Sequence, residues 1–61
     1  MAEDIAAALD AEPDARHFFE TLATFYRKNF IRWIDDARQP ATRAKHTAET
    51  IAALKSGKRE G

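Results

Sequence analysis

Two histidines and one pair of adjacent carboxylates are the side chains best suited to catalysis or metal binding. His17 and His46 lie far apart in the chain, and no third ligand stands at a characteristic spacing from either. Asp35 and Asp36 are neighbours, and neighbouring residues of a helix point about 100° apart, so the two carboxylates do not share a site as a catalytic pair does. We interpret both histidines as ordinary surface residues.

Other catalytic arrangements are also missing from the sequence. The chain has no Cys, and it shows no Ser-His-Asp arrangement, phosphate-binding loop or nucleotide-binding fingerprint. In addition, 61 residues leave little room for both a core and a deep substrate pocket. We therefore expect a protein that is not an enzyme, with no catalytic residue, no metal site and no cofactor.

The basic residues suggest a binding surface. Residues 1–26 carry six acidic side chains and one basic side chain, whereas residues 27–61 carry nine basic and four acidic ones, so the two parts have formal charges of −5 and +5. A basic face can bind an acidic protein surface or phosphates. Alternatively, the two halves attract each other within the fold. The candidate partner-binding residues are Arg27, Lys28, Arg32, Arg38, Arg43 and Lys45.

Thr42 and Arg43 also have a structural interpretation, as an alternative to a role of Arg43 in binding. Thr42 falls in the first turn of an expected helix, where its hydroxyl can bond free backbone donors. Arg43 can reach back to the acidic end of the preceding helix and lock the turn. For the same reason, we expect Asp35 and Asp36 to form ion pairs with Arg32, Arg38 or Arg43.

The elements that must position these residues are helices. Ala, Glu, Lys and Arg are abundant and Val is absent, which predicts an all-α fold, a compact bundle of three to four short helices. Pro13 and Pro40 favour helix starts, and Gly57 a C-terminal cap. Thr24 either caps a third helix or lies within one helix over 13–38; we prefer the cap. The expected helices cover 3–11, 13–22, 25–38 and 40–56.

The stretch NFIRWIDDARQPATR, residues 29–43, is expected to organise the fold, with Trp33 as a core anchor. In the fourth helix, we expect Ala44, Thr47, Ala48, Ile51 and Leu54 to face inward. One or two Phe side chains are expected to remain exposed, and an exposed cluster would mark a partner surface. The predicted core consists of Leu9, Phe18, Phe19, Leu22, Phe30, Trp33, Ile34, Ile51 and Leu54.

The chain length predicts one domain over residues 1–61, with 58–61 as a flexible tail. No apolar run approaches the roughly 18 residues that suggest a membrane span. The acidic start MAEDIAAALDAE lacks the basic region of a secretory signal. We therefore expect a cytoplasmic protein.

Four segments carry a family resemblance: AAALDAEPDARHFFETL, RKNFIRWIDDAR, ATRAK and LKSGKR. Together they resemble the bacteriocin-protection family, also called YdeI or OmpD-associated, from about Asp4 to Arg59. The resemblance implies a helical domain that in longer members stands at the C-terminal end, behind another domain. It brings no established reaction, cofactor or catalytic residue.

Two functions from different classes follow. The first is a non-catalytic protein-interaction module of a bacterial protein, whose partner is another protein or a companion domain. The alternative is a small nucleic-acid-binding domain that uses the basic face of the third and fourth helices, although the acidic first half would repel phosphates. An enzyme fragment that needs a companion domain is a third, weaker possibility.

Overall fold

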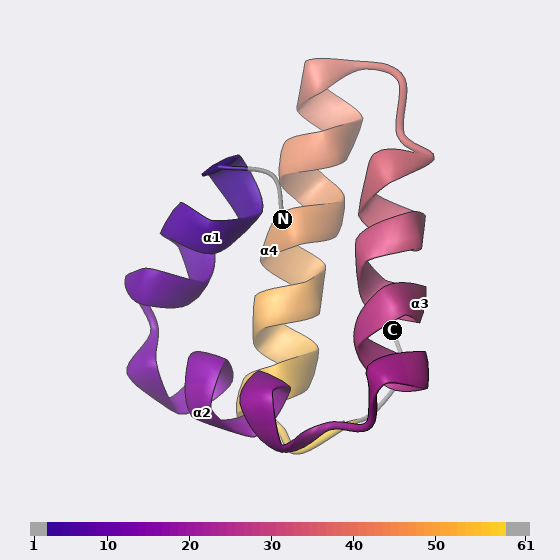
Figure 1. Ribbon diagram of the computed structural model, residues 1–61. Coiled ribbons are helices and arrows are strands. Elements are labelled where there is room, and N and C mark those ends of the chain that lie inside the picture. Colours follow the sequence, from indigo (N-terminus) through magenta and orange to yellow (C-terminus); the bar gives the residue numbers. More distant parts are fainter. Residues whose placement is uncertain (1–2, 59–61) are drawn as a thin grey trace.

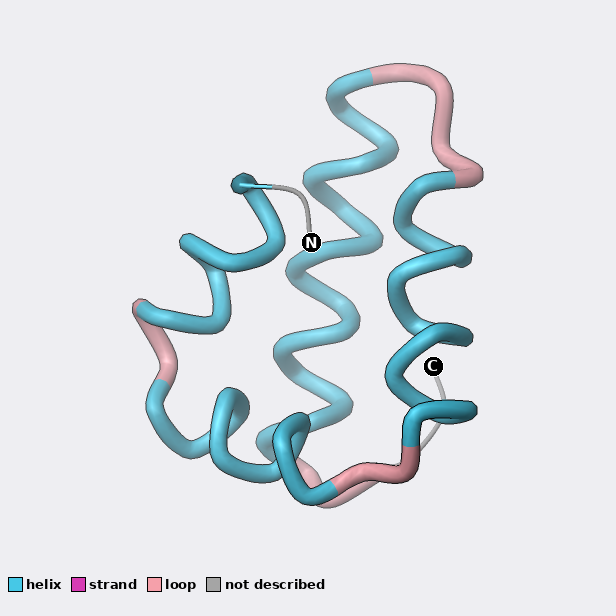
Figure 2. The backbone as a smooth tube through the Cα atoms, viewed as in Figure 1, coloured by secondary structure: helices cyan, strands magenta, loops and turns pink. Residues whose placement is uncertain are grey.

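The structure, a computed structural model, describes residues 3–58 of the 61-residue chain. These residues form four helices and no strand, which confirms the all-α prediction (Figure 2). The segment 13–38 contains two helices rather than one. The helices are α1 (Glu3–Asp10), α2 (Pro13–Thr21), α3 (Thr24–Asp35) and α4 (Pro40–Lys55).

The last helix is the centre of the fold. As Figure 1 shows, α3 runs antiparallel beside α4, α1 lies on the other side of α4, and α2 crosses one end of it. α4 packs against all three other helices. The prediction that residues 29–43 organise the fold was therefore wrong, because that stretch supplies most of α3, one connection and only the first turn of the central helix.

Prolines and one extended corner set the helix starts. Pro13 and Pro40 are the first residues of α2 and α4, as predicted. Between α2 and α3, Leu22 and Ala23 are extended, with ψ angles of 147° and 151°, and the buried Leu22 side chain holds this corner. Thr24 is not the cap that we predicted, because Ala23 takes that position and the Thr24 hydroxyl instead accepts a hydrogen bond from Arg27 Nη2 at 3.2 Å.

The third helix ends three residues earlier than the predicted Arg38. Its last turn closes with N–H groups of Asp36 and Ala37 that donate to the carbonyls of Arg32 and Ile34. Residues 36–39 form the connection that reverses the chain so that α4 can pack back on α3 (Figure 1). The periodic pattern predicted a longer helix, because Ala37 and Arg38 continue the period although the chain has already turned.

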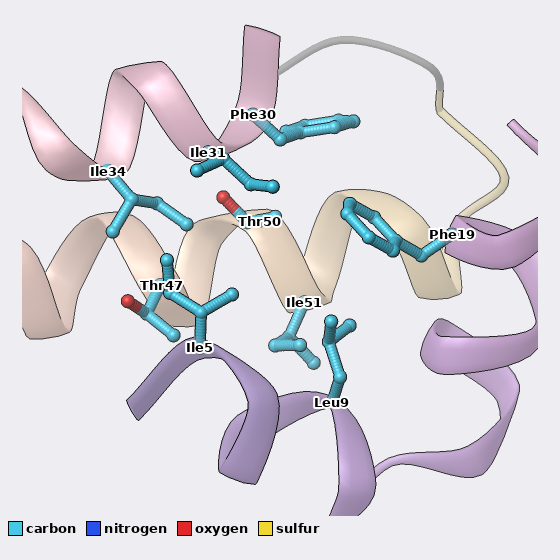
Figure 3. A pocket seen from close by; sticks show the side chains of 9 residues that line it. All are labelled: Ile5, Leu9, Phe19, Phe30, Ile31, Ile34, Thr47, Thr50 and Ile51. Atoms are coloured by element: carbon cyan, nitrogen blue, oxygen red, sulfur yellow. The ribbon is translucent and has the colours of Figure 1, made fainter. Parts of the chain in front are cut away.

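The core lies where α1, α2 and α3 meet α4. Its buried apolar side chains are Ile5, Leu9, Ala15, Phe19, Leu22, Phe30, Ile34 and Leu54. Figure 3 shows side chains of α1, α2 and α3 directed toward α4 around a cavity of about 10 Å³, no larger than one water molecule occupies. Six predicted core residues are confirmed, whereas Phe18, Trp33 and Ile51 lie partly buried at its margin.

The inward face of α4 differs from the predicted stripe. Ala44 and Ala48 are exposed, whereas Thr50, which the pattern left outside, is buried. The Thr50 hydroxyl can be buried because it donates to the carbonyl of His46 at 2.8 Å, one turn earlier. The small, partly polar residues of α4 therefore face three neighbouring helices without forming a clear apolar stripe.

Gly57 ends α4 as predicted. Its φ angle is +79°. The N–H of Gly57 donates to the carbonyl of Leu54 at 3.0 Å, and the N–H of Lys58 donates to the carbonyl of Ala53 at 2.9 Å. These two bonds form a Schellman cap, which uses glycine because the left-handed conformation strains other residues. Lys58, the first residue of the predicted tail, belongs to this cap, and residues 59–61 lie outside the described residues.

Gly57→Ala should destabilise the domain by about 1 kcal/mol, because alanine is strained in the left-handed conformation that glycine adopts freely. Thermal unfolding followed by circular dichroism measures the change. Ser56→Ala is the matched control, since Ser56 has a right-handed φ of −86°. Equal melting temperatures of Gly57→Ala and wild type would contradict the positive φ angle at this cap.

Candidate functional site

His46 is stacked on Trp33 between α3 and α4. The two rings lie 4.0 Å apart between centroids and 7° from parallel, and His46 Nδ1 is 3.2 Å from the carbonyl oxygen of Trp33. His46 is therefore partly buried, and its interpretation as an ordinary surface residue was wrong. His17 is exposed on α2. Between residues 3 and 58, no three His, Cys, Asp or Glu side chains gather closely enough to hold a metal ion.

Arg43 joins three helices through two carboxylates. Its Nε and Nη2 lie 2.6 and 3.1 Å from the two oxygens of Asp4 on α1, and its Nη1 lies 2.8 Å from Asp35 on α3. The side chain of Arg43 is only 24% exposed. The predicted contact with the acidic end of the third helix is confirmed. Nothing in the sequence pointed specifically to Asp4, although the opposite charges of the two halves indicate such pairing.

These ion pairs change the pKa of both partners. The hydrogen bond from Arg43 lowers the pKa of Asp4 below its usual value of 3.8, and hydrogen bonds to Asp4 and Asp35 raise the pKa of Arg43. The guanidinium therefore remains charged at any pH at which the domain folds. The pH dependence that the cluster contributes therefore comes from Asp4.

The lowered pKa of Asp4 predicts a loss of stability in acid. A carboxylate whose folded-state pKa is depressed stabilises the fold above its ordinary pKa, and this contribution disappears as the pH falls through the folded value. The loss should therefore begin near pH 3.8 and continue below it. Urea unfolding of wild type and Asp4→Asn between neutral pH and about pH 2 measures it. Parallel profiles for the two proteins would show that Arg43 does not stabilise ionised Asp4.

Two further ion-pair groups use the acidic first half. Arg16 lies 2.7 Å from Asp10 and 2.9 Å from Glu20, and Lys55 of α4 lies 3.4 Å from Glu12. The Lys55 pair, like that of Arg43 with Asp4, joins the acidic half to the basic half. The predicted attraction between the halves is therefore present in the fold.

The six candidate binding residues do not lie at one place. Arg27 and Lys28 are near the start of α3, whereas Arg38, Arg43 and Lys45 lie in the α3–α4 connection or the first turns of α4, at the opposite end of the antiparallel pair (Figure 1). Arg32 lies in the last turn of α3. Arg43 forms ion pairs with Asp4 and Asp35. Arg27 is partly buried, and its Nε has no hydrogen-bond partner within the described residues.

A more coherent surface is the α3 outer face, which we define as Phe25, Lys28, Asn29 and Arg32. Offsets of three, four and seven residues from Phe25 place these four exposed side chains on one side of the helix. Phe25 is 67% exposed, and its ring meets Tyr26 edge-on at 5.5 Å. Within residues 3–58, neither Lys28 nor Arg32 forms an ion pair.

Trp33 connects this face to α4. It follows Asn29 by one helical turn and lines a surface groove of about 360 Å³ together with Glu49, Ala52 and Ala53 of α4. Two partly buried aromatic side chains, Tyr26 and Trp33, therefore flank the α3 outer face. The sequence predicted that one or two Phe side chains would remain exposed, but it did not indicate which ones.

No helix within residues 3–58 is both long enough and apolar enough to cross a membrane.

The comparisons with known proteins concern the whole fold. No curated protein and no solved structure matches the chain. The profile of the family described as bacteriocin-protection, YdeI or OmpD-associated matches residues 1–57, a range that contains all four helices and the α3 outer face. The resemblance seen in the sequence is confirmed, and the chain belongs to the bacteriocin-protection, YdeI or OmpD-associated family.

Proposed function

We propose that this domain is a non-catalytic protein-interaction module and that its contact surface is the α3 outer face. The exposure of Phe25 carries the proposal. Among the residues that the structure describes, Phe25 is the one large apolar side chain that is exposed, in a domain that buries or partly buries the others. A partner that covers this ring would remove its apolar surface from water and gain binding energy.

The composition of the surroundings supports the same function. Contact surfaces between proteins are enriched in aromatic residues and Arg, and their strongest anchors are frequently Trp, Tyr and Arg. Phe25, Tyr26, Trp33 and Arg32 lie on or beside one face of α3. Moreover, the enclosed cavity in the core has only about 10 Å³, and the hollows of about 360 and 400 Å³ are open grooves at the surface.

Family membership suggests where such a module acts. The family is described by bacteriocin protection and by association with OmpD. We infer that the domain contributes binding, to a protein or to a companion domain, in a bacterial cell. This role needs neither a cofactor nor a metal.

Affinity capture from nuclease-treated bacterial lysate tests the proposal with Phe25→Ser. Phe25 is exposed, so this variant should keep its helical circular dichroism and melting temperature. The control is Ala48→Ser, which makes an exposed apolar residue of α4 equally polar. We expect wild type and Ala48→Ser to retain a protein that Phe25→Ser loses.

Two results would contradict the proposal. Either no protein is retained above background, or folded Phe25→Ser retains the same protein as wild type. If only nucleic acid is retained before nuclease treatment and nothing remains afterwards, the nucleic-acid-binding alternative takes its place.

A further inference from the structure

We propose that the α3 outer face binds an acidic segment of the partner protein, and that an apolar side chain of this segment covers Phe25. This inference rests on the proposed function and adds the chemistry of the partner. It uses two properties of one surface: an exposed aromatic ring, and cations that no carboxylate of the described chain compensates.

The cations of the α3 outer face form no ion pair within the described residues. Arg16, Arg43 and Lys55 each contact at least one carboxylate. Lys28 and Arg32 contact none within residues 3–58, although the domain has as many acidic as basic residues overall. Within residues 3–58, Arg27, Arg38, Lys45 and Lys58 form no ion pair either. Lys28 and Arg32, however, are the two exposed cations that share one side of α3 with the exposed Phe25 ring, where an external carboxylate can reach them.

The acidic residues at the end of α3 do not cancel this charge. Asp35 is already bonded to Arg43 at 2.8 Å. Asp36 lies one turn beyond Arg32 and, in the structure, forms no ion pair with it. From Phe25 to Arg32 the face carries positive charge only, so it attracts an acidic segment and repels a basic one.

The spacing of the face limits how such a segment is built. Lys28 and Arg32 are four residues apart, which corresponds to about 6 Å along a helix. Carboxylates reach this separation when they are four residues apart in a helix or two apart in an extended segment, where each residue advances about 3.3 Å. The apolar side chain should lie beyond the carboxylate that faces Lys28, because Phe25 precedes Lys28 by about one turn.

Selection from a display library of random peptides tests the chemistry directly, because it does not require the partner to be identified first. Wild-type domain should enrich peptides that combine Asp or Glu at these spacings with a large apolar residue. Synthetic versions of the enriched peptides are then titrated against the domain. Trp33 is the only Trp of the chain and flanks the face, so its fluorescence reports binding. Affinity should fall with salt, because the Debye length is only about 10 Å at 0.1 M.

Matched variants locate the contact. Arg32→Glu should weaken the enriched peptides by more than about tenfold, since it places like charges against each other. Lys45→Glu is the control, because it makes the same change of charge at an exposed position of α4 that is not part of the α3 outer face. Arg32→Gln replaces Arg32→Glu if the latter loses its helical circular dichroism, and Phe25→Ser should weaken binding as well.

Several results would overturn the inference. They are enrichment of neutral or basic peptides, equal losses for Lys45→Glu and Arg32→Glu, and no enrichment at all. The inference also fails if oligonucleotides or vesicles of anionic phospholipid bind, are weakened by the Arg32 and Phe25 substitutions, and acidic peptides do not bind. It fails as well if sedimentation shows that the face binds a second copy of the chain. If lysate capture depends on Phe25 while the library yields no acidic peptide, the proposed function stands and this inference fails.

Discussion

Leu54→Ala should leave much of the protein unfolded at 25 °C. Leu54 is only 2% exposed and lies on α4, the helix that all three others contact. Truncation of a buried Leu to Ala destabilises a protein by about 2–5 kcal/mol, because apolar contacts are lost and a cavity remains. A domain of this size has a total stability of about 3–5 kcal/mol. The variant should therefore lose most of its helical circular dichroism or melt near room temperature.

The control uses the same kind of truncation at an exposed position. Phe25→Ala removes a larger side chain, but Phe25 is 67% exposed, so its melting temperature should remain close to that of wild type. The two variants therefore separate burial from side-chain size. If Leu54→Ala retained the wild-type melting temperature, α4 would not be the helix on which the core is built.

The local signals of the sequence predicted the helix boundaries well where one residue type decides the backbone. Pro13 and Pro40 lack an N–H and have a fixed φ, which suits the first helical position and little else in a helix. Gly57 has a positive φ, which the cap requires. These effects act within a few residues, so they can be inferred without knowing the tertiary structure.

Boundaries that depend on tertiary packing were predicted less well. Nothing in the sequence shows that α3 ends at Asp35, because Ala37 and Arg38 are good helix residues and continue its period. The chain turns there so that α4 can pack antiparallel to α3 (Figure 1). Likewise, Thr24 suited a cap by residue type, but the corner at Leu22 and Ala23 is fixed by burial of Leu22.

Residue size misled the prediction of the central helix. Trp33 is large and apolar, which suggested a core anchor, yet it lies at the margin against His46. α4 presents small and polar residues such as Thr50, whose hydroxyl bonds within the helix. Of the residues of α4, only Thr50 and Leu54 are buried, so the inward face of this helix is not the apolar stripe by which amphipathic helices are recognised.

The candidate site was predicted in part. The charge difference between the halves identified the basic residues, and the pairing of Arg43 with Asp35 followed from their positions around the turn. Which cations remain without a carboxylate depends on contacts between helices, such as Lys55 with Glu12, that sequence spacing does not reveal. The exposure of Phe25 is decided by the rotation of α3 against the core, which also lies beyond sequence spacing.

Ala15→Leu should destabilise the domain by about 1–3 kcal/mol, because added methyl groups in a filled core force neighbouring side chains and backbone to move. Ala15 lies near the start of α2 and is 0% exposed, and α2 packs against both α1 and α4. A larger side chain there should push α2 away from the end of the central helix. Urea unfolding followed at a helical circular dichroism wavelength measures the loss.

Ala48→Leu makes the identical chemical change where there is room. Ala48 is exposed and lines an open groove of about 400 Å³ between α1 and α4. Leu and Ala are both good helix formers, so this variant should stay within about 0.5 kcal/mol of wild type. A large difference between the two variants would come from packing rather than from helix propensity. If Ala15→Leu and Ala48→Leu both unfolded at the same urea concentration as wild type, α2 would not be packed closely against its neighbours. In that case the core would not fix the position of the α2–α3 corner, which leads into Phe25.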